Sequence, residues 1–167
     1  MSEAQSVEQL ISKNAYANQP YVTSSGVVGN IMVPIIEVTG NPAGHYPDPP
    51  VAEYMLQFIR RGEAGARMDL GAGAFQTPLR RDTIALAAPQ VNTNYEVFGR
   101  FDMTALALPT QLFETAHASL GSTSRLDLEV LHTQMLRSAF ASELVNQLSN
   151  EARAGNPNSA LFVDHLV

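Results

Sequence analysis

The chain has 167 residues, of which 45% are hydrophobic and 16% charged, and its formal net charge is −6. This length and composition predict a single domain with one hydrophobic core. The acidic balance without any basic run argues against a free-standing nucleic-acid binder, and the absence of cysteine excludes disulfides, thiolate metal sites and cysteine nucleophiles.

Residues 1–52 are predicted to form an irregular segment whose short strands pack on the rest of the domain. The opening stretch MSEAQSVEQLISKNAY is polar and acidic, unlike a signal peptide, and no apolar run has the length that spans a bilayer. Residues 27–38 suggest a pair of short strands, and residues 40–50 are dense in glycine and proline, which indicates an ordered loop. A cytoplasmic protein with no membrane partner is therefore expected.

Residues 53–108 are predicted to form the core of a small antiparallel β-barrel or sandwich, because turn residues recur at short, regular intervals. The strand candidates are residues 53–60, 65–70, 74–79, 83–88, 94–98 and 100–108. Gly71 and Gly73 lie between strand candidates, no helix pattern follows them, and the third glycine of GxGxxG and a Walker lysine are both missing. The pair therefore predicts a hairpin turn and not a phosphate-binding loop.

Residues 109–167 are predicted to be mainly helical. Thr110 can cap a helix that Gly121 ends, residues 126–130 alternate as one more strand would, and residues 131–152 carry an amphipathic stripe. A further apolar helix is expected at residues 159–167, and its sudden end suggests a cut within a longer protein. Sheet first and helices after gives the expected fold class: α+β, with a small antiparallel barrel followed by two or three C-terminal helices.

The order of these elements resembles the N-terminal regulatory half of AraC/XylS-type transcription regulators, over about residues 54–167. No single motif is diagnostic, and the order of several weak ones carries the resemblance. They are Arg61-Gly62 with Arg67-Met68-Asp69-Leu70-Gly71, then residues 84–89, 101–109, 144–148, 154–157 and 161–166.

The resemblance implies a cupin-like barrel that binds a small-molecule effector, forms a homodimer and performs no catalysis. It also implies that DNA is contacted only through a C-terminal domain absent from this chain, which would explain the acidic balance. Two alternatives stay open: a non-metal cupin enzyme such as an isomerase, and a free-standing ligand-binding cupin.

The histidines and serines do not indicate a catalytic or metal site. Metal-binding cupins need a His-x-His pair with a nearby carboxylate and a later histidine, whereas His45, His117, His132 and His165 are widely spaced and lie outside residues 53–108. No Gly-x-Ser-x-Gly elbow is present. We therefore expect no metal, no cofactor and no catalytic residue.

A ligand pocket is predicted on the first strand of the barrel and its neighbours. Tyr54, Leu56, Phe58 and Arg60 share one face of that strand, while Met55, Gln57, Ile59 and Arg61 share the other. If the aromatic face lines the barrel, Arg60 would anchor an anion among apolar walls; otherwise the aromatics fill the core and Arg60 emerges at the rim. The candidate ligand-binding residues are Tyr54, Phe58, Arg60, Tyr95 and Phe101.

The amphipathic stripe at residues 131–152 has two interpretations. It packs entirely against its own barrel, or it shares its apolar face with a second copy of the chain. The candidate dimer-interface residues are Leu131, Met135, Phe140, Leu144 and Leu148.

Overall fold

The computed structural model describes residues 4–12, 22–28, 33–119, 121 and 128–154. The helix expected at residues 159–167, and His165 within it, lie outside the described residues. The helical elements are α1 (Val7–Ser12), α2 (Thr110–Ser119), the 3-10 helix η1 (Glu129–His132) and α3 (Ala139–Ala154).

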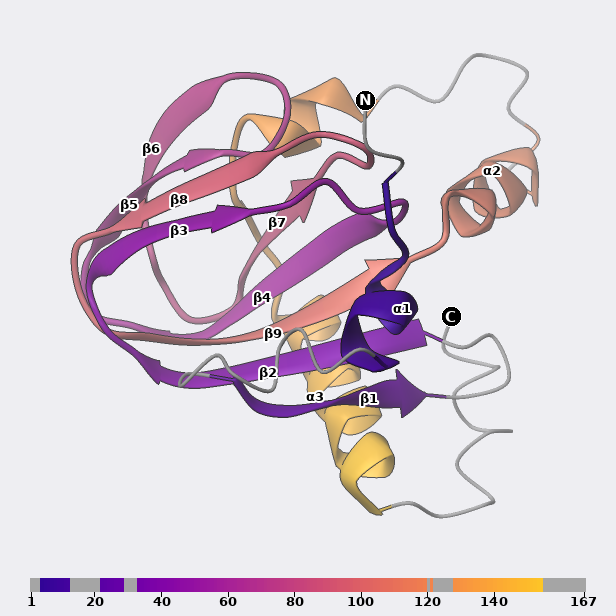
Figure 1. The fold of residues 1–167 in the computed structure, drawn as a ribbon, viewed down its shortest axis with the longest axis horizontal. Helices are drawn as coiled ribbons and strands as arrows, with labels where there is room; N and C mark the ends of the chain where they lie inside the picture. The colour runs from indigo at the N-terminus through magenta and orange to yellow at the C-terminus, as the bar shows by residue number, and fades with distance from the viewer. Residues whose placement is uncertain (1–3, 13–21, 29–32, 120, 122–127, 155–167) are drawn as a thin grey trace.

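The described strands form two antiparallel sheets that face each other (Figure 1). The large sheet has six strands in the order β1 (Val22–Val28), β2 (Val33–Asn41), β9 (Phe101–Leu108), β4 (Tyr54–Gly62), β7 (Thr83–Ala87) and β10 (Leu136–Arg137). The small sheet has four strands in the order β3 (Gly44–Asp48), β8 (Thr93–Val97), β5 (Gly65–Asp69) and β6 (Ala74–Pro78).

The strand prediction for residues 53–108 is confirmed, since β4 to β9 coincide with the expected segments. The hairpin interpretation of the glycine pair is also confirmed. Gly71 and Gly73 lie between β5 and β6 with φ of 108° and 104°, a region that residues with a side chain rarely adopt.

The expected fold, α+β with a small antiparallel barrel, is confirmed only in part. The described part of the chain is mostly β, and no strand ladder joins the large sheet to the small one, so the barrel is not closed. Residues 40–50, which were expected to form a loop, add to the strand content. Within them Gly44–Asp48 form β3, which pairs with β8 at the edge of the small sheet. An edge strand tolerates Pro47 because one side of its backbone needs no partner.

The division expected at residue 53 does not separate two structural units. Residues 33–41 form β2, whose Ile35 and Ile36 pair with Leu106 and Ala105 of β9 inside the large sheet. β2 and β3 therefore belong to the sheets and do not merely pack on them.

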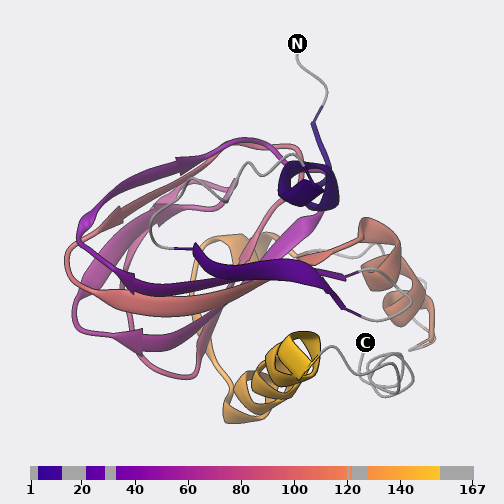
Figure 2. The same ribbon diagram turned by 60° about the horizontal axis from the view of Figure 1, so that its bottom comes forward.

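The hydrophobic core lies in two layers on opposite sides of the large sheet. Between the sheets, a buried cluster includes Ile59, Met68 and Phe101. On the other side, Phe58 and Leu106 of the large sheet pack with Val145 and Leu148 of α3. Figure 2 shows α3 on the side of the large sheet that faces away from the small sheet.

The helical region follows the sequence in part. The helix at α2 is confirmed, and Gly121 follows it with φ of 68°. The strand expected at residues 126–130 is not observed where the chain is described, because Glu129–His132 form η1. The helix expected from residue 131 begins only at Ala139. The residues just before it form β10, in which Leu136 pairs with Ile84 of β7.

Candidate functional site: a cavity between the sheets

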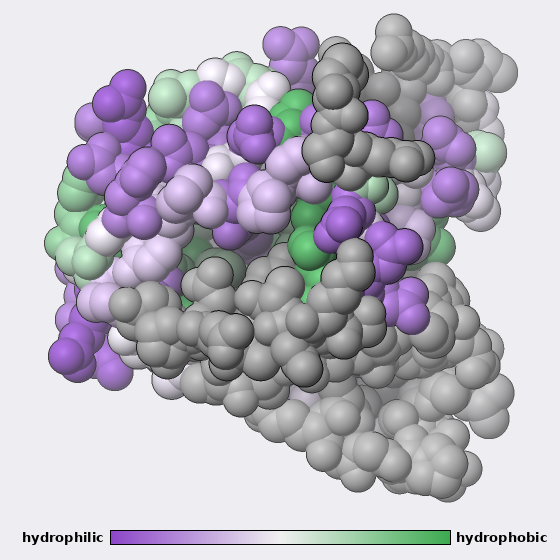
Figure 3. All heavy atoms as spheres, viewed as in Figure 1, coloured by the Kyte–Doolittle hydropathy of each residue, from purple (hydrophilic) through white to green (hydrophobic). Residues whose placement is uncertain are grey.

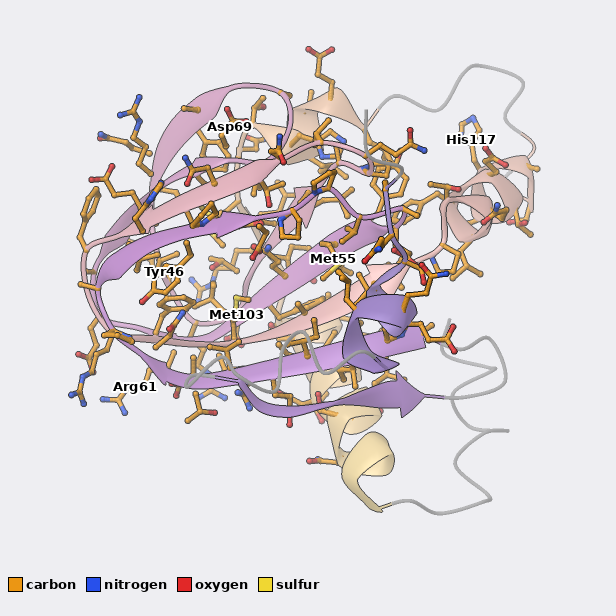
Figure 4. All side chains as sticks on the ribbon, in the orientation of Figure 1. Tyr46, Met55, Arg61, Asp69, Met103 and His117 are labelled. Carbon is orange, nitrogen blue, oxygen red and sulfur yellow. The ribbon has the colours of Figure 1, made fainter. Side chains whose placement is uncertain are left out.

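The space between the sheets is incompletely filled and leaves a cavity of about 100 Å³. Residues of β2, β4 and β9 form one wall, and residues of β3, β5 and β8 form the other. Most of the lining is apolar, and Met55, Met68 and Met103 contribute flexible side chains that adapt to the shape of a ligand. Figure 4 shows Tyr46, Met55 and Met103 in the region between the sheets.

A short chain of hydrogen bonds crosses this apolar space. The Gln57 amide donates from Nε2 to the Tyr95 hydroxyl at 2.6 Å, and that hydroxyl donates to Thr93 Oγ1 at 3.1 Å. All three residues are buried. Buried polar groups with partners of this kind orient one another and give a cavity a fixed polar side.

Asn41 adds a polar atom whose hydrogen-bonding capacity is unused. The residue is 6% exposed, lines the cavity at the end of β2, and its Oδ1 atom is buried with no hydrogen-bond partner. Leaving a buried acceptor unpaired costs about 1–3 kcal/mol. A hydroxyl or N–H group of a bound molecule would satisfy this acceptor.

Asp48 lies at the rim of the same cavity. Along β3 it follows Tyr46 at the spacing that puts side chains on one face of a strand, and both residues line the cavity. Asp48 is an exposed residue that also lines the cavity. Burial there raises the pKa of Asp48 from 3.8 to about 6.

This raised pKa predicts a measurable pH dependence. Because the folded protein holds the Asp48 proton more tightly than the unfolded chain does, the stabilisation is fully present below pH 3.8 and is lost as the pH rises through about 6. Asp48→Asn keeps a neutral side chain, so its stability relative to the wild type should increase from pH 4 to pH 7. Urea unfolding across this range measures the difference, with Glu96→Gln on the solvent face of β8 as the charge-matched control. A difference that is constant with pH would contradict the assignment.

The structure separates the candidate ligand-binding residues into two groups. Tyr95 and Phe101 line the cavity. Phe58 packs under α3 on the opposite face of the large sheet, and Tyr54 stacks on His132 of η1 and contacts Phe113 of α2. The face of β4 that lines the cavity therefore carries Met55, Gln57 and Ile59 instead.

Arg60 extends across the outer face of the large sheet and not into the cavity. Its NH2 group donates to the Val38 carbonyl at 3.0 Å, to Thr39 Oγ1 at 3.2 Å and to the Met103 carbonyl at 3.3 Å. Its NH1 group lies 3.5 Å from the buried carboxylate of Glu37. Arg60 thus ties β4 to β9 and β2.

Sequence reasoning did not single out Asn41, Asp48 or Gln57. Gln57 carried a detectable signal, because it is a polar residue that lies between the apolar Met55 and Ile59 on one face of the strand. Asn41 and Asp48 carried none, since both stand in a stretch rich in glycine and proline that is typical of a loop.

The candidate dimer-interface residues do not form one face. Leu148 is 6% exposed against the large sheet, whereas Phe140 is 76% exposed. Leu131 and Met135 precede α3, and Met135 packs on the cluster between the sheets. Leu144 is half-buried on α3.

Among the residues that the structure describes, no group of three or more acidic or histidine side chains is arranged to hold a metal ion. His45 lies on β3, His117 on α2 and His132 in η1. No helix of the described residues is both long enough and apolar enough to cross a membrane. Figure 3 shows mainly hydrophilic residues on the described surface near the small sheet, with hydrophobic residues between them.

No protein-family model matches the chain, and no curated protein matches it. Solved structures do resemble it. A cupin domain from Bordetella pertussis aligns with 13% identity and a TM-score of 0.40, covering 56% of this chain and 98% of that one. Hydroxypropylphosphonic acid epoxidase from S. wedmorenis aligns with 12% identity and a TM-score of 0.35, covering 51% and 56%.

ToxT of Vibrio cholerae, an AraC-family regulator bound to (E)-4-(8-methylnaphthalen-1-yl)but-3-enoic acid, aligns with 8% identity and a TM-score of 0.44. The alignment covers 77% of this chain and 49% of ToxT.

Proposed function

We propose that this chain is a ligand-binding domain whose cavity between the sheets takes a small, mainly apolar molecule that carries a hydroxyl or N–H group. The observation that supports this most is the buried Oδ1 atom of Asn41, which lacks a hydrogen-bond partner although the residue lines a cavity with mostly apolar walls. Cavities with this make-up, apolar walls and a few convergent polar groups, are typical of small-molecule sites.

The volume of the cavity limits the size of the ligand. At about 100 Å³ the cavity is somewhat smaller than an apolar protein cavity that binds benzene, which measures about 150 Å³. Small movements of the methionine side chains would admit a molecule with one aromatic ring. Phenol has such a ring and a single hydrogen-bond donor, so it is a suitable probe.

Phenol is expected to bind more tightly than benzene, by up to about tenfold, because only phenol satisfies Asn41 Oδ1. Asn41→Leu should abolish this preference while leaving benzene binding similar. Isothermal titration calorimetry measures both ligands, and Asn94→Leu, on the exposed face of β8, is the matched control. Equal binding of the two ligands by the wild type would contradict the proposal.

We further propose that this ligand-binding domain is the sensory and dimerisation domain of an AraC-type regulator. The supporting features are the order of sequence motifs over residues 54–167, the cavity, and the exposed Phe140 near the start of α3. In such a domain the effector acts by binding one arrangement of the protein more tightly than another. A reading frame that continues past Val167 into two helix-turn-helix patterns would support this role, and a stop codon there would favour a free-standing binding module.

One observation favours a second candidate, a non-metal enzyme that moves a proton. Asp48 lies at the rim of the cavity with its pKa raised to about 6, which suits a general acid or base near neutral pH. Incorporation of solvent deuterium into a small ketone, lost in Asp48→Asn, would support this reaction class. Unchanged recovery of the ketone would favour binding alone.

A further inference from the structure

A second cavity of about 100 Å³ lies on the opposite side of the large sheet from the first. Its lining comes from three places: β4 supplies Phe58, Ile59 and Arg60, the turn before β7 supplies Arg81 and Asp82, and α3 supplies Ser142 and Asn146. Unlike the cavity between the sheets, whose walls are mostly apolar, this one is lined about equally by polar and apolar surface.

Two of the residues that line this cavity carry a buried polar atom with no hydrogen-bond partner. Ser142 is 8% exposed and its Oγ atom is unpartnered, and the Nε atom of Arg60 is likewise buried and unpartnered. A serine in a helix often bonds to the carbonyl four residues earlier. Here the Ser138 carbonyl accepts the Ser142 backbone N–H at 3.1 Å, and the Ser142 hydroxyl has no hydrogen-bond partner in the part of the chain that the structure describes.

Arg60 Nε can only donate, and the Ser142 hydroxyl can donate as well, so their shared complement is an oxygen acceptor. Burying such donors unpaired costs about 1–3 kcal/mol each. A ligand with two neighbouring oxygens would recover this cost by accepting from both residues.

The charged residues around the second cavity indicate how much negative charge the ligand carries. Arg60 faces Glu37 at 3.5 Å, and Arg81 faces Asp82 at 3.6 Å, so each arginine already has a carboxylate beside it. The remaining positive potential comes from the first turns of α3, where Ser142 lies. This modest potential suits a singly charged anion better than a doubly charged phosphate.

We propose that this second cavity binds a small carboxylate, which accepts hydrogen bonds from Arg60 Nε and Ser142 Oγ, with the Asn146 amide beside it. The ligand would connect β4 directly to α3, because its partners lie on these two elements. This site is separate from the cavity between the sheets, so either proposal can fail without the other.

Acetate tests the proposal, with acetamide as its uncharged counterpart of the same shape. In ¹⁵N–¹H spectra of the whole chain, the Arg60 Nε–H resonance should shift saturably with acetate and remain unchanged at the same concentrations of acetamide. Ser142→Ala should weaken acetate binding by about tenfold. Ser149→Ala is the matched control: this serine also lies buried and unpartnered on α3, but it does not line the cavity.

Three outcomes would overturn the proposal. The first is a shift that does not saturate, or that acetate and acetamide cause equally. Either result would show that the shift does not report binding of a carboxylate. The second is equal acetate affinity of the wild type and Ser142→Ala. The third is tighter binding of inorganic phosphate than of acetate, which would contradict a site for a singly charged carboxylate. Because Ser→Ala within a helix is a mild change, the remaining resonances report whether the variant keeps its fold.

Discussion

Arg60→Met is expected to lower the free energy of unfolding by about 3 kcal/mol. Glu37 is 3% exposed, and the substitution removes the guanidinium that faces its carboxylate at 3.5 Å. It also removes the hydrogen bonds that the Arg60 NH2 group donates to the Val38 and Met103 carbonyls. A buried carboxylate that loses a charged neighbour is costly to keep ionised. Urea denaturation at pH 7 measures the loss.

The neighbouring arginine provides the control. Arg61 pairs with Glu63 at 2.6 Å, but their side chains are 69% and 46% exposed. Arg61→Met should therefore change stability by no more than about 0.5 kcal/mol. Adding Glu37→Leu to Arg60→Met should restore part of the lost stability, because position 37 then no longer holds a buried carboxylate. Equal effects of Arg60→Met and Arg61→Met would show that the contact with Glu37 contributes little.

The positions of the strands could be predicted because turn residues mark their ends. Gly71, Gly73 and the Arg81-Asp82 turn lie between β5, β6 and β7, and both glycines and Asp82 have positive φ. These conformations depend on a few local residues, so the sequence indicates them directly. The edge strands depend less on local residues: β3 and β10 are strands only because β8 and β7, which are distant in the sequence, pair with them.

The orientation of β4 could not be predicted, because each face carries both apolar and polar residues. Tyr54 and Phe58 looked like the lining of a pocket, yet α2, η1 and α3 cover that face. The small sheet covers the other face, where Gln57 finds the Tyr95 hydroxyl. Which face meets which layer depends on contacts between residues far apart in the chain, and a pattern within one strand does not contain them.

The second large effect that we expect separates two residues of one helical stripe. Leu148→Ala should lower the free energy of unfolding by about 2–4 kcal/mol, because Leu148 is 6% exposed among Phe58, Leu106 and Val145. Phe140→Ala removes a larger side chain from the same helix. It should nevertheless change stability by no more than about 0.5 kcal/mol, because Phe140 is 76% exposed.

The same two variants test the proposed dimer. If a second copy covers Phe140, then Phe140→Ala should weaken self-association in sedimentation measurements while leaving monomer stability intact. Leu148→Ala should instead act on the fold of each subunit, since Leu148 contacts its own sheet. An unfolding cost for Phe140→Ala as large as that for Leu148→Ala would contradict its exposed position. Unchanged self-association in Phe140→Ala would remove this residue from the interface. The stripe that looked uniform in the sequence would then serve only to attach α3 to the large sheet through Val145 and Leu148.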